Sequence, residues 1–316
     1  VVRATRPELG TDDYGRGIQA HCEPGMGTAG SLVVMGSLVT DNFDAGIFVG
    51  AVEVEINASV VRDTRSRVSD HAGGRGISAR CHPGLGLCGT LGVTGSVIAG
   101  NREMGLHVSG METTVIRTVV RDTLHQEQNE EFGRGINAAC DGYLEQCSLL
   151  TVDRCLVAGN RSAGIMTFGV EAAVTRTVVR DTLSRASDQA LGIGIGAGCD
   201  EELGTCGSLR VAESLIVGNR LMGVTAGGTD ATVIDSVVRD TQPRESDLAG
   251  GFGISSLCHP ETGACASLAV TGCAVVGNRY AGIFVAGADA AVVDTVVRDT
   301  LPQESDQSGG RGIDAE

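Results

Sequence analysis

Eight of the eleven cysteines form four pairs, and the two members of each pair are seven residues apart. Loops this short suit disulfides, which form in oxidising compartments and contribute roughly 2 to 3 kcal/mol each. Zinc is the alternative, because His82 and His259 follow the first cysteine of their pairs, although no second pair lies nearby at a usual zinc-site spacing. We therefore predict four disulfides and a secreted or cell-surface location. The pairs are Cys81/Cys88, Cys140/Cys147, Cys199/Cys206 and Cys258/Cys265.

Three basic residues, His21, Arg80 and His107, could do acid-base chemistry if the fold placed them on neighbouring strands. A lyase needs a basic group that works near pH 7, usually beside a calcium ion held by several acids. The alternative interpretation is that these are ordinary exposed strand residues of mixed type. They are the only catalytic candidates that the sequence offers, and none is assigned a role.

Acidic loops raise the question of calcium. Glu130 with Glu131, and Asp200 with Glu201, carry enough charge to hold an ion within one loop. The alternative is that they are solvated acidic turns. We predict no resident cofactor, and Ca2+ is the one ion that these loops would suit.

The block Val-Val-Arg-Asp-Thr recurs every 59 residues, beginning at Val60, Val119, Val178, Val237 and Val296. A fixed period without insertions is typical of a solenoid, in which one unit stacks on itself. We therefore predict a single domain over residues 1–316. It contains five full repeats (1–59, 60–118, 119–177, 178–236 and 237–295) and a partial sixth (296–316).

Each repeat contains the same pattern twice, as one short and one long coil. Small hydroxyl or thiol residues open every copy, at intervals that alternate between 22 and 37 residues. Glycine followed by a branched aliphatic residue recurs once per coil, as in Gly76-Ile77, and continues in the period-two alternation of strands. We therefore predict an all-β chain of about ten coils, whose parallel strands lie about 4.8 Å apart. The small residues are Ser37, Ser59, Ser96, Thr118, Cys155, Thr177, Ser214, Ser236, Cys273 and Thr295.

A corner follows each of these strands, and Asn and Thr alternate there from coil to coil. The preceding residue is Gly or Asp almost throughout, which suits a left-handed backbone. We expect the stacked polar side chains to hydrogen-bond along the rod, and most glycines to lie at corners that need a positive φ. The corner residues are Asn42, Asn101, Asn160, Asn219 and Asn278, alternating with Thr64, Thr123, Thr182, Thr241 and Thr300.

The motif Gly-Ile-x-Val followed by Ser-Val-Val-x-Gly-Asn resembles the right-handed parallel β-helix repeat proteins. That superfamily includes pectate lyases, tailspikes and carbohydrate-binding or sugar-hydrolase β-helices. The resemblance covers the whole chain and implies the fold; right-handed crossovers are also the general preference for parallel strands. It says little about activity.

The long coil exceeds the short one by 15 residues, divided between an acidic loop and the cysteine loop. Both loops flank the Gly-Ile strand, and in enzymes of the resembled superfamily loops so placed wall a substrate groove. Alternation gives a groove floor that includes Phe48, Ser78, Asn137, Phe168 and Phe284. A glycosidase would need a facing pair of carboxylates, and this floor supplies only one, in the last coil.

Other conspicuous residues have structural interpretations. The Arg-Asp of every repeat, such as Arg121-Asp122, returns in each turn, whereas an active site is needed once; we place Asp at the corner and Arg outside. Cys155 and Cys273 replace inward Ser or Thr, so we predict them buried and unreactive. The residue after each small residue, such as Val60, either forms an outward apolar stripe or is partly buried.

Composition excludes some partners. The net charge is −15, from 39 acidic and 24 basic residues, and an acidic rod repels nucleic acid. No apolar run approaches the roughly 20 residues of a membrane-spanning helix. The chain opens and closes inside a repeat, so we expect its ends to be trimmed.

We predict a structural or adhesive β-helix segment that forms part of a longer or end-to-end stacked assembly. The grounds are the near-perfect repetition and the lack of a complete catalytic set. Its partners would be copies of itself, further repeats of a longer chain, or surface glycan. The alternative is a polysaccharide-binding or polysaccharide-cleaving protein, of lyase or hydrolase type, that uses the groove over the Gly-Ile strand.

Overall fold

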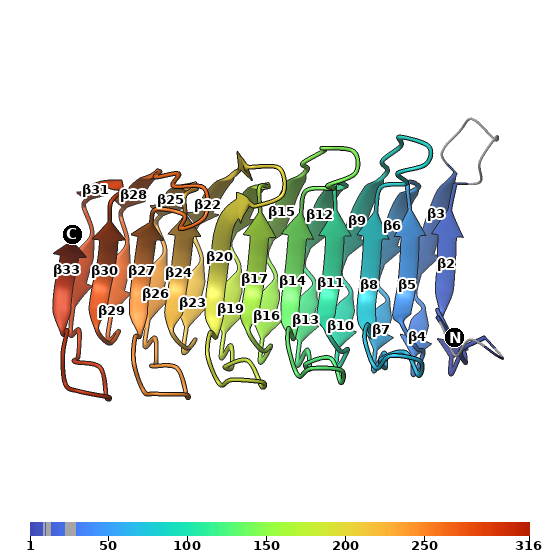
Figure 1. Cartoon of the computed structure of the whole chain (residues 1–316), viewed down its shortest axis with the longest axis horizontal. Coiled ribbons are helices and arrows are strands. Elements are labelled where there is room, and N and C mark those ends of the chain that lie inside the picture. Colours follow the sequence, from blue (N-terminus) through green and yellow to red (C-terminus); the bar gives the residue numbers. More distant parts are fainter. Residues whose placement is uncertain (9, 11–13, 23–29) are drawn as a thin grey trace.

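The computed structural model of the chain describes residues 1–8, 10, 14–22 and 30–316. Regular structure in these residues consists of strands, which form three parallel sheets. Figure 1 shows successive coils side by side along the long axis, from the N-terminus to the C-terminus. No helix among the described residues could cross a membrane.

Sheet 1 contains the Val-Val strands of the repeat. Each strand pairs in parallel with the equivalent strand one coil earlier and one coil later, so that Val97 lies beside Val60 and Val119. In spatial order its strands are β1 (Val2–Arg3), β4 (Leu38–Thr40), β7 (Val60–Arg62), β10 (Val97–Ala99), β13 (Val119–Arg121), β16 (Leu156–Ala158), β19 (Val178–Arg180), β23 (Leu215–Val217), β26 (Val237–Arg239), β29 (Ala274–Val276) and β32 (Val296–Arg298).

Sheet 2 contains the Gly-Ile strands. A short antiparallel strand, β21 (Thr205–Cys206), pairs with one of them and closes a cysteine loop. In spatial order the parallel strands are β2 (Ile18–His21), β5 (Ala45–Gly50), β8 (Arg75–Arg80), β11 (Met104–Ser109), β14 (Arg134–Ala139), β17 (Ala163–Phe168), β20 (Ile193–Asp200), β24 (Met222–Gly227), β27 (Phe252–Leu257), β30 (Ala281–Ala286) and β33 (Arg311–Ala315).

Sheet 3 precedes sheet 1 in every coil and completes the cross-section. Its strands alternate between exposed and buried residues, as the period-two pattern predicts. In spatial order they are β3 (Ser31–Met35), β6 (Glu53–Asn57), β9 (Thr90–Thr94), β12 (Glu112–Ile116), β15 (Leu149–Asp153), β18 (Glu171–Thr175), β22 (Ser208–Ala212), β25 (Asp230–Ile234), β28 (Ser267–Thr271) and β31 (Asp289–Val293).

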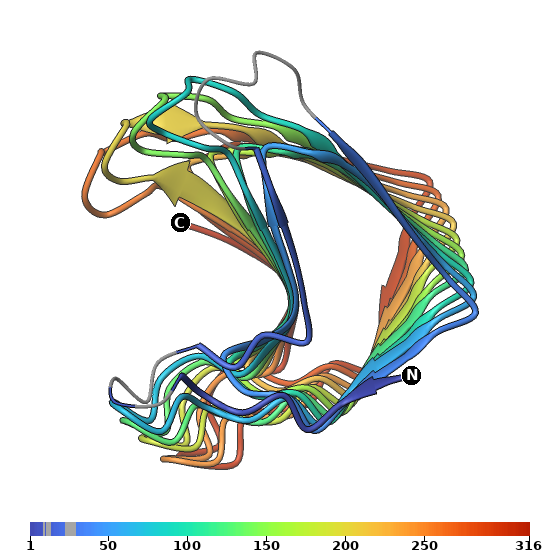
Figure 2. The same ribbon diagram turned by 90° about the vertical axis from the view of Figure 1, so that its right-hand side faces the viewer.

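The coil is right-handed. In Figure 2, which faces the N-terminal end, the chain rises through sheet 2, crosses to sheet 3 and returns through sheet 1 as it recedes. That path is clockwise, which is the hand that twisted parallel strands favour. The predicted all-β, right-handed parallel β-helix of about ten coils is therefore confirmed.

Branched aliphatic side chains fill the interior of the coil. Away from the terminal coils, the second valine of each Val-Val pair and the aliphatic residue after the evenly spaced glycine are fully buried, as for Val61, Ile77, Val120 and Ile136. Burial on this scale is the main stabilising term, at roughly 25 cal/mol for each Å² of apolar surface removed from water.

The small inward residues form a hydrogen-bonded ladder down sheet 1. The Ser96 backbone N–H donates to Thr118 Oγ1 at 3.3 Å, and the Thr118 N–H donates to Cys155 Sγ at 3.5 Å. Cys155 and Cys273 are buried as predicted. Burial raises the pKa of the Cys155 thiol to about 11, and it also raises the pKa of Cys273. Both thiols are therefore held in the less nucleophilic, protonated form.

The asparagine corners hold neighbouring coils together. Asn101 is fully buried; its Oδ1 accepts from the Thr64 N–H at 3.1 Å, and its Nδ2 donates to Val61 O at 3.2 Å. The residues before the corner, such as Asp63 and Gly100, have positive φ, as predicted. The threonine corners differ, because the Thr64 hydroxyl is buried without a partner.

The glycine before the inward aliphatic residue lies in a strand and has a role that the sequence did not predict. It does not adopt a positive φ; its place is decided by close approach of the next coil. A Cβ atom on Gly76 would lie 2.5 Å from Gly105 O and 2.7 Å from Asn101 Nδ2. Close packing of two backbones therefore requires glycine in this ladder, which sequence spacing does not show.

The outer face of sheet 1 carries the repeated Arg-Asp pairs. Arg121 and Asp122 are both about half exposed and form an ion pair at 2.8 Å, with Asp122 at the positive-φ corner. The first valine of each pair points outward but is half-buried in most coils, as for Val60. Only some of them, including Val237 and Val296, are exposed. The outward residues therefore form a narrow, partly covered row.

Candidate functional site

Two sets of loops project to the same side of sheet 2, from opposite ends of its strands (Figure 2). One set contains the four predicted disulfides, which are confirmed with Cα–Cα distances of 4.1 to 4.3 Å. Disulfide sulfurs are not thiolate ligands, so the zinc alternative does not apply to these pairs. The bonded pairs are Cys81–Cys88, Cys140–Cys147, Cys199–Cys206 and Cys258–Cys265.

The two cysteines of a pair are not equally buried, a difference that their regular spacing does not predict. Cys81 and Cys199 are 1% and 0% exposed, because they continue a strand of sheet 2 and pack beneath the next coil. Cys88 is only half-buried and Cys265 is exposed, since both stand on the returning arm of the loop. The first cysteine is buried in three of the four loops and half-buried at Cys258, whereas the second cysteine is half-buried or exposed in all four.

Consecutive acidic loops hydrogen-bond to one another and form the second wall. The Gln128 N–H donates to His71 O, and the Ser187 N–H donates to Glu130 O, at 3.0 and 3.2 Å. The same contact recurs between later loops. This wall is therefore a continuous structure that follows the axis of the coil.

The strand register places the predicted floor residues in rows on the outer face of sheet 2. Phe48, Ser78, His107 and Asn137 follow one another on adjacent strands. Phe48, Ser78 and Asn137 are nevertheless 7% exposed or less, which corrects the expectation of an open floor. Long arginine side chains cover part of it, since the Arg16 guanidinium lies 3.8 Å from the Phe48 ring centroid.

Aromatic floor residues are also partly covered. Phe168 is half-buried, and the Arg134 guanidinium lies 5.3 Å from its ring centroid. Phe284 packs against Phe252 at 5.2 Å and belongs to a cluster with Tyr280 in the last coils. In these cation–π and aromatic pairs the rings already contact other side chains of the protein. A ligand over Phe168 would first meet the Arg134 side chain.

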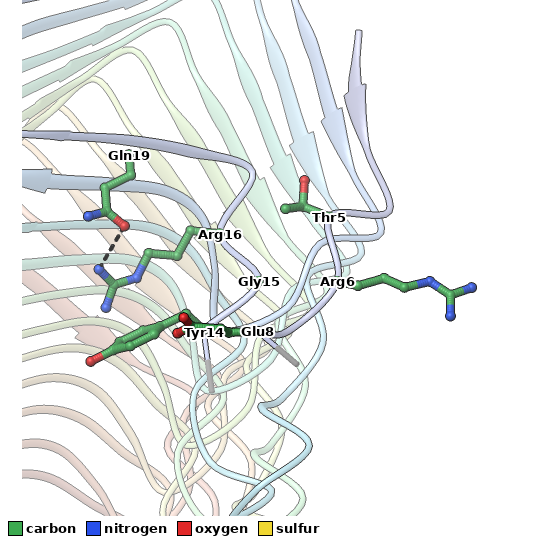
Figure 3. Close-up of a pocket in the computed structure, with 7 residues that line it drawn as sticks. All are labelled: Thr5, Arg6, Glu8, Tyr14, Gly15, Arg16 and Gln19. Carbon is green, nitrogen blue, oxygen red and sulfur yellow. Dashed lines mark hydrogen bonds between the residues drawn. The ribbon is translucent and has the colours of Figure 1, made fainter. Parts of the chain in front are cut away.

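Three cavities follow one another along the N-terminal half of sheet 2. The first, of about 450 Å³, lies at Tyr14, Arg16 and Gln19, where Figure 3 shows Arg16 directed toward Gln19 and Arg6 pointing away. The second, of about 260 Å³, is also lined by Arg16 and Gln19. It continues through Arg80 into the third, of about 310 Å³.

The structure brings the three basic candidates together only pairwise. His21 and Arg80 line the second cavity, whereas Arg80 and His107 line the third. β8 and β11 are adjacent, but β2 and β11 are three strands apart, or roughly 14 Å at the usual strand spacing. Arg80 thus connects two histidines that cannot act on the same atom.

His107 is held as a neutral hydrogen-bond donor. Arg134 Nη1 donates to Asn137 Oδ1 at 2.6 Å, so the Asn137 amide nitrogen faces His107 Nδ1 at 3.3 Å. His107 Nδ1 must then accept, which leaves the proton on Nε2. Burial, together with the charges of Arg75, Arg134 and Arg80, holds the His107 pKa well below 6.5. A neutral imidazole in this tautomer can donate from Nε2 but cannot take a proton there.

Two carboxylates that do not belong to the predicted groove floor also line the third cavity. Asp141 and Glu202 come from cysteine loops of successive repeats, and Tyr143 lies beside them. Asp141 Oδ1 accepts from two backbone N–H groups of its own loop, at 3.1 and 3.0 Å. The sequence does show that Asp141 follows a disulfide cysteine. Strand alternation, however, does not show which loop side chains fold over the floor.

The acidic calcium candidates are spread apart. Glu130 lies in an acidic loop, whereas Glu201 belongs to a cysteine loop and approaches His259 at 3.9 Å. Asp200 Oδ1 accepts from the Leu203 N–H of its own turn at 3.1 Å, and Glu131 Oε2 accepts from the Asn129 side chain. Across the described part of the chain, no three His, Cys, Asp or Glu side chains are grouped to hold a metal ion.

Comparison with known proteins gives a likeness in fold. No protein-family model and no curated protein matches the chain. Among solved structures, pectate lyase Pel9A matches with a TM-score of 0.44 and 14% identity, over 89% of this chain and 68% of that one. A double mutant of the periplasmic alginate epimerase AlgG matches with a TM-score of 0.47 and 11% identity, over 84% and 73%. Function therefore has to be argued from this chain's own residues.

Proposed function

We propose that the protein binds an extended acidic polysaccharide in the groove over β2 to β14. The observation that carries the proposal is the concentration of cationic side chains there in a chain of net charge −15. Arg16, Arg75 and Arg80 line the successive cavities; Arg16 and Arg75 are each paired with one acid, whereas Arg80 forms no ion pair with any described residue. Guanidinium groups bind carboxylates in a planar, two-point manner that suits a charged sugar.

Binding fits the groove better than cleavage does. A lyase base has to accept a proton, and His107 is protonated on Nε2 while Nδ1 is occupied by Asn137. Asp141 and Glu202 could serve a hydrolase only with one of them protonated at working pH. The described acids form no calcium cluster of the kind that lyase chemistry usually uses. We therefore assign the groove to recognition.

The test is an array of acidic and neutral oligosaccharides, followed by calorimetric titration of the best ligand. Arg80→Ala should weaken binding about tenfold or more, the loss expected for one charge-assisted hydrogen bond. Arg121→Ala is the matched control, because Arg121 is an exposed arginine on the outer face of sheet 1. Release of reducing ends or unsaturated uronates would show cleavage, and equal binding by the two variants would refute the proposal.

A structural or adhesive role is the second candidate. It is favoured by the hydrogen-bonded loops, which repeat the same contact from coil to coil and stiffen the rod on one side. In this role the partners would be copies of the chain, further repeats or surface glycan. Sedimentation and electron microscopy test it, because end-to-end filaments support it and separate short particles at high concentration contradict it. The disulfides support a secreted or cell-surface location for either role.

A further inference from the structure

One triplet of positions recurs in every repeat at the edge of the groove. It consists of the residue before the glycine of the long-coil strand, the positive-φ residue of the next short coil, and a residue of the next acidic loop. The spacings are 28 and 23 residues in each case. The triplets are Arg16/Asp44/Arg67, Arg75/Glu103/Gln126, Arg134/Ser162/Arg185, Ile193/Leu221/Arg244 and Phe252/Tyr280/Gln303.

The first triplet shows what this arrangement binds. Asp44 is buried, with a side chain only 9% exposed, and lies between two guanidinium groups. Arg16 Nε donates to Asp44 Oδ2 at 2.8 Å, and Arg67 Nη1 donates to Asp44 Oδ1 at 2.9 Å. Two cations at this site therefore hold one carboxylate.

The second triplet contains one cation instead of two. Arg75 Nε and Nη2 donate to the two oxygens of Glu103 at 3.0 and 2.7 Å. The loop position is Gln126, so one cation faces one carboxylate. In the fourth and fifth triplets the strand and short-coil residues are both apolar or aromatic, and no arginine lies at the strand position.

The third triplet has two cations and no acid. Ser162, which is buried, stands where Asp44 and Glu103 stand in the earlier repeats. Arg134 forms no ion pair with any described residue, and its Nε is buried without a hydrogen-bond partner. The Nε and Nη2 edge that Glu103 occupies on Arg75 is therefore unfilled on Arg134.

One nitrogen of the Arg185 guanidinium, Nη1, has no carboxylate partner. Its Nε and Nη2 donate to Asp188, as those of Arg67 donate to Asp70, but Nη1 of Arg185 lacks the counterpart of Asp44. Burial and the nearby charge of Arg185 lower the pKa of Arg134 to about 10. Glu103 and Glu131 act in the opposite direction, but the first is bonded to Arg75 and the second accepts from Asn129.

We infer that Arg134, Arg185 and Ser162 form a subsite for one carboxylate group of a bound ligand. The carboxylate takes the place that Asp44 fills in the first repeat, and it accepts from Arg134 Nε and from Arg185 Nη1. Its source is a uronate unit of the polysaccharide, and in this respect the inference rests on the proposed function. The subsite extends the groove beyond the third cavity, because Arg134 also bonds Asn137 on the floor.

The decisive variant is Ser162→Asp, which restores the first triplet within the third repeat. Thermal unfolding is followed in sodium chloride and in sodium acetate or glucuronate at equal ionic strength. The wild type should be stabilised by the carboxylates over chloride, since a ligand that binds only the folded state raises its stability. S162D should lose this response, whereas Ser162→Ala, which keeps both cations unpaired, should retain it.

A second variant covers the case in which S162D does not fold. Arg134→Gln removes the cation and should weaken the affinity for glucuronate about tenfold or more. The subsite is refuted if wild type, S162D and R134Q respond to carboxylates alike. Binding of an oligouronate is measured as well, to distinguish a carboxylate that belongs to a polymer from a free one. S162D should bind the oligouronate more weakly than the wild type does, and this binding should still depend on Arg80.

The two proposals fail in different ways. Polymer binding that depends on Arg80 but is unchanged in S162D and R134Q overturns the subsite and leaves the proposed function standing. A carboxylate response that disappears in S162D, without any binding of acidic polymer, supports the subsite and overturns the proposed function.

Discussion

The asparagine corners give a sharp test of what holds the coils together. Asn160 is fully buried; its Oδ1 accepts from the Thr123 N–H at 3.1 Å and its Nδ2 donates to Val120 O at 3.3 Å. At the same corner one coil later, Thr182 is equally buried, but its hydroxyl has no partner. The two side chains are therefore similarly buried, but only Asn160 is hydrogen-bonded.

Asn160→Ala should destabilise the protein by about 3 to 5 kcal/mol. Two hydrogen bonds contribute about 1 kcal/mol each, and the buried Thr123 N–H left without an acceptor costs a further 1 to 3 kcal/mol or so. Thr182→Val keeps the shape and removes an unsatisfied hydroxyl, so it should be neutral or stabilising by up to about 1 kcal/mol.

Urea unfolding measures both values, provided that the slope with denaturant is the same for the variants. Because a stacked rod can unfold in parts, amide hydrogen exchange gives the local readout. The Thr123 N–H should exchange much faster in N160A than in T182V. Equal destabilisation by the two changes, or unchanged protection of Thr123, would show that the corner is held by packing alone.

Three further outcomes are expected. The His107 pKa lies below the ordinary 6.5, so the unfolded chain takes up a proton first as pH falls; wild type should therefore lose more stability than His107→Gln between pH 7 and 5 in urea unfolding. Equal pH dependence would contradict this. The Cys155 thiol, with a pKa of about 11, should resist alkylation at pH 8 until the protein unfolds, as mass spectrometry would show. Replacing Cys140 and Cys147 together by serine should cost roughly 2 to 3 kcal/mol, and an unchanged denaturation midpoint would show that this loop is already ordered without its disulfide.

Repetition made the strand register predictable. Once Val97 and Val119 occupy equivalent positions, a parallel solenoid must place them side by side, and the structure does so. The disulfides were predictable for a related reason, because cysteines seven residues apart in one loop can close on each other without help from the rest of the fold. The unequal burial of Cys81 and Cys88 was not predictable, since it depends on which arm of the loop the next coil covers.

The solvent exposure of the floor residues could not be predicted from the sequence in the same way. Alternation correctly placed Phe48 and Asn137 outside the core, but it could not show that arginine side chains lie over them. An arginine stem is long enough to reach several residues along or across a sheet, so its direction depends on the partners that it finds there.

The sequence by itself determined the period, the coil, the register and the cysteine loops, because each follows from contacts between a residue and its counterpart one coil away or its partner in the same loop. Only the tertiary structure decided which cations in the groove are already neutralised. Arg16 and Arg75 find buried carboxylates 28 residues along the chain, whereas Arg134 finds Ser162 at the same distance. An ion pair requires two charged groups within about 4 Å, and folding alone brings residues so far apart in sequence to that separation.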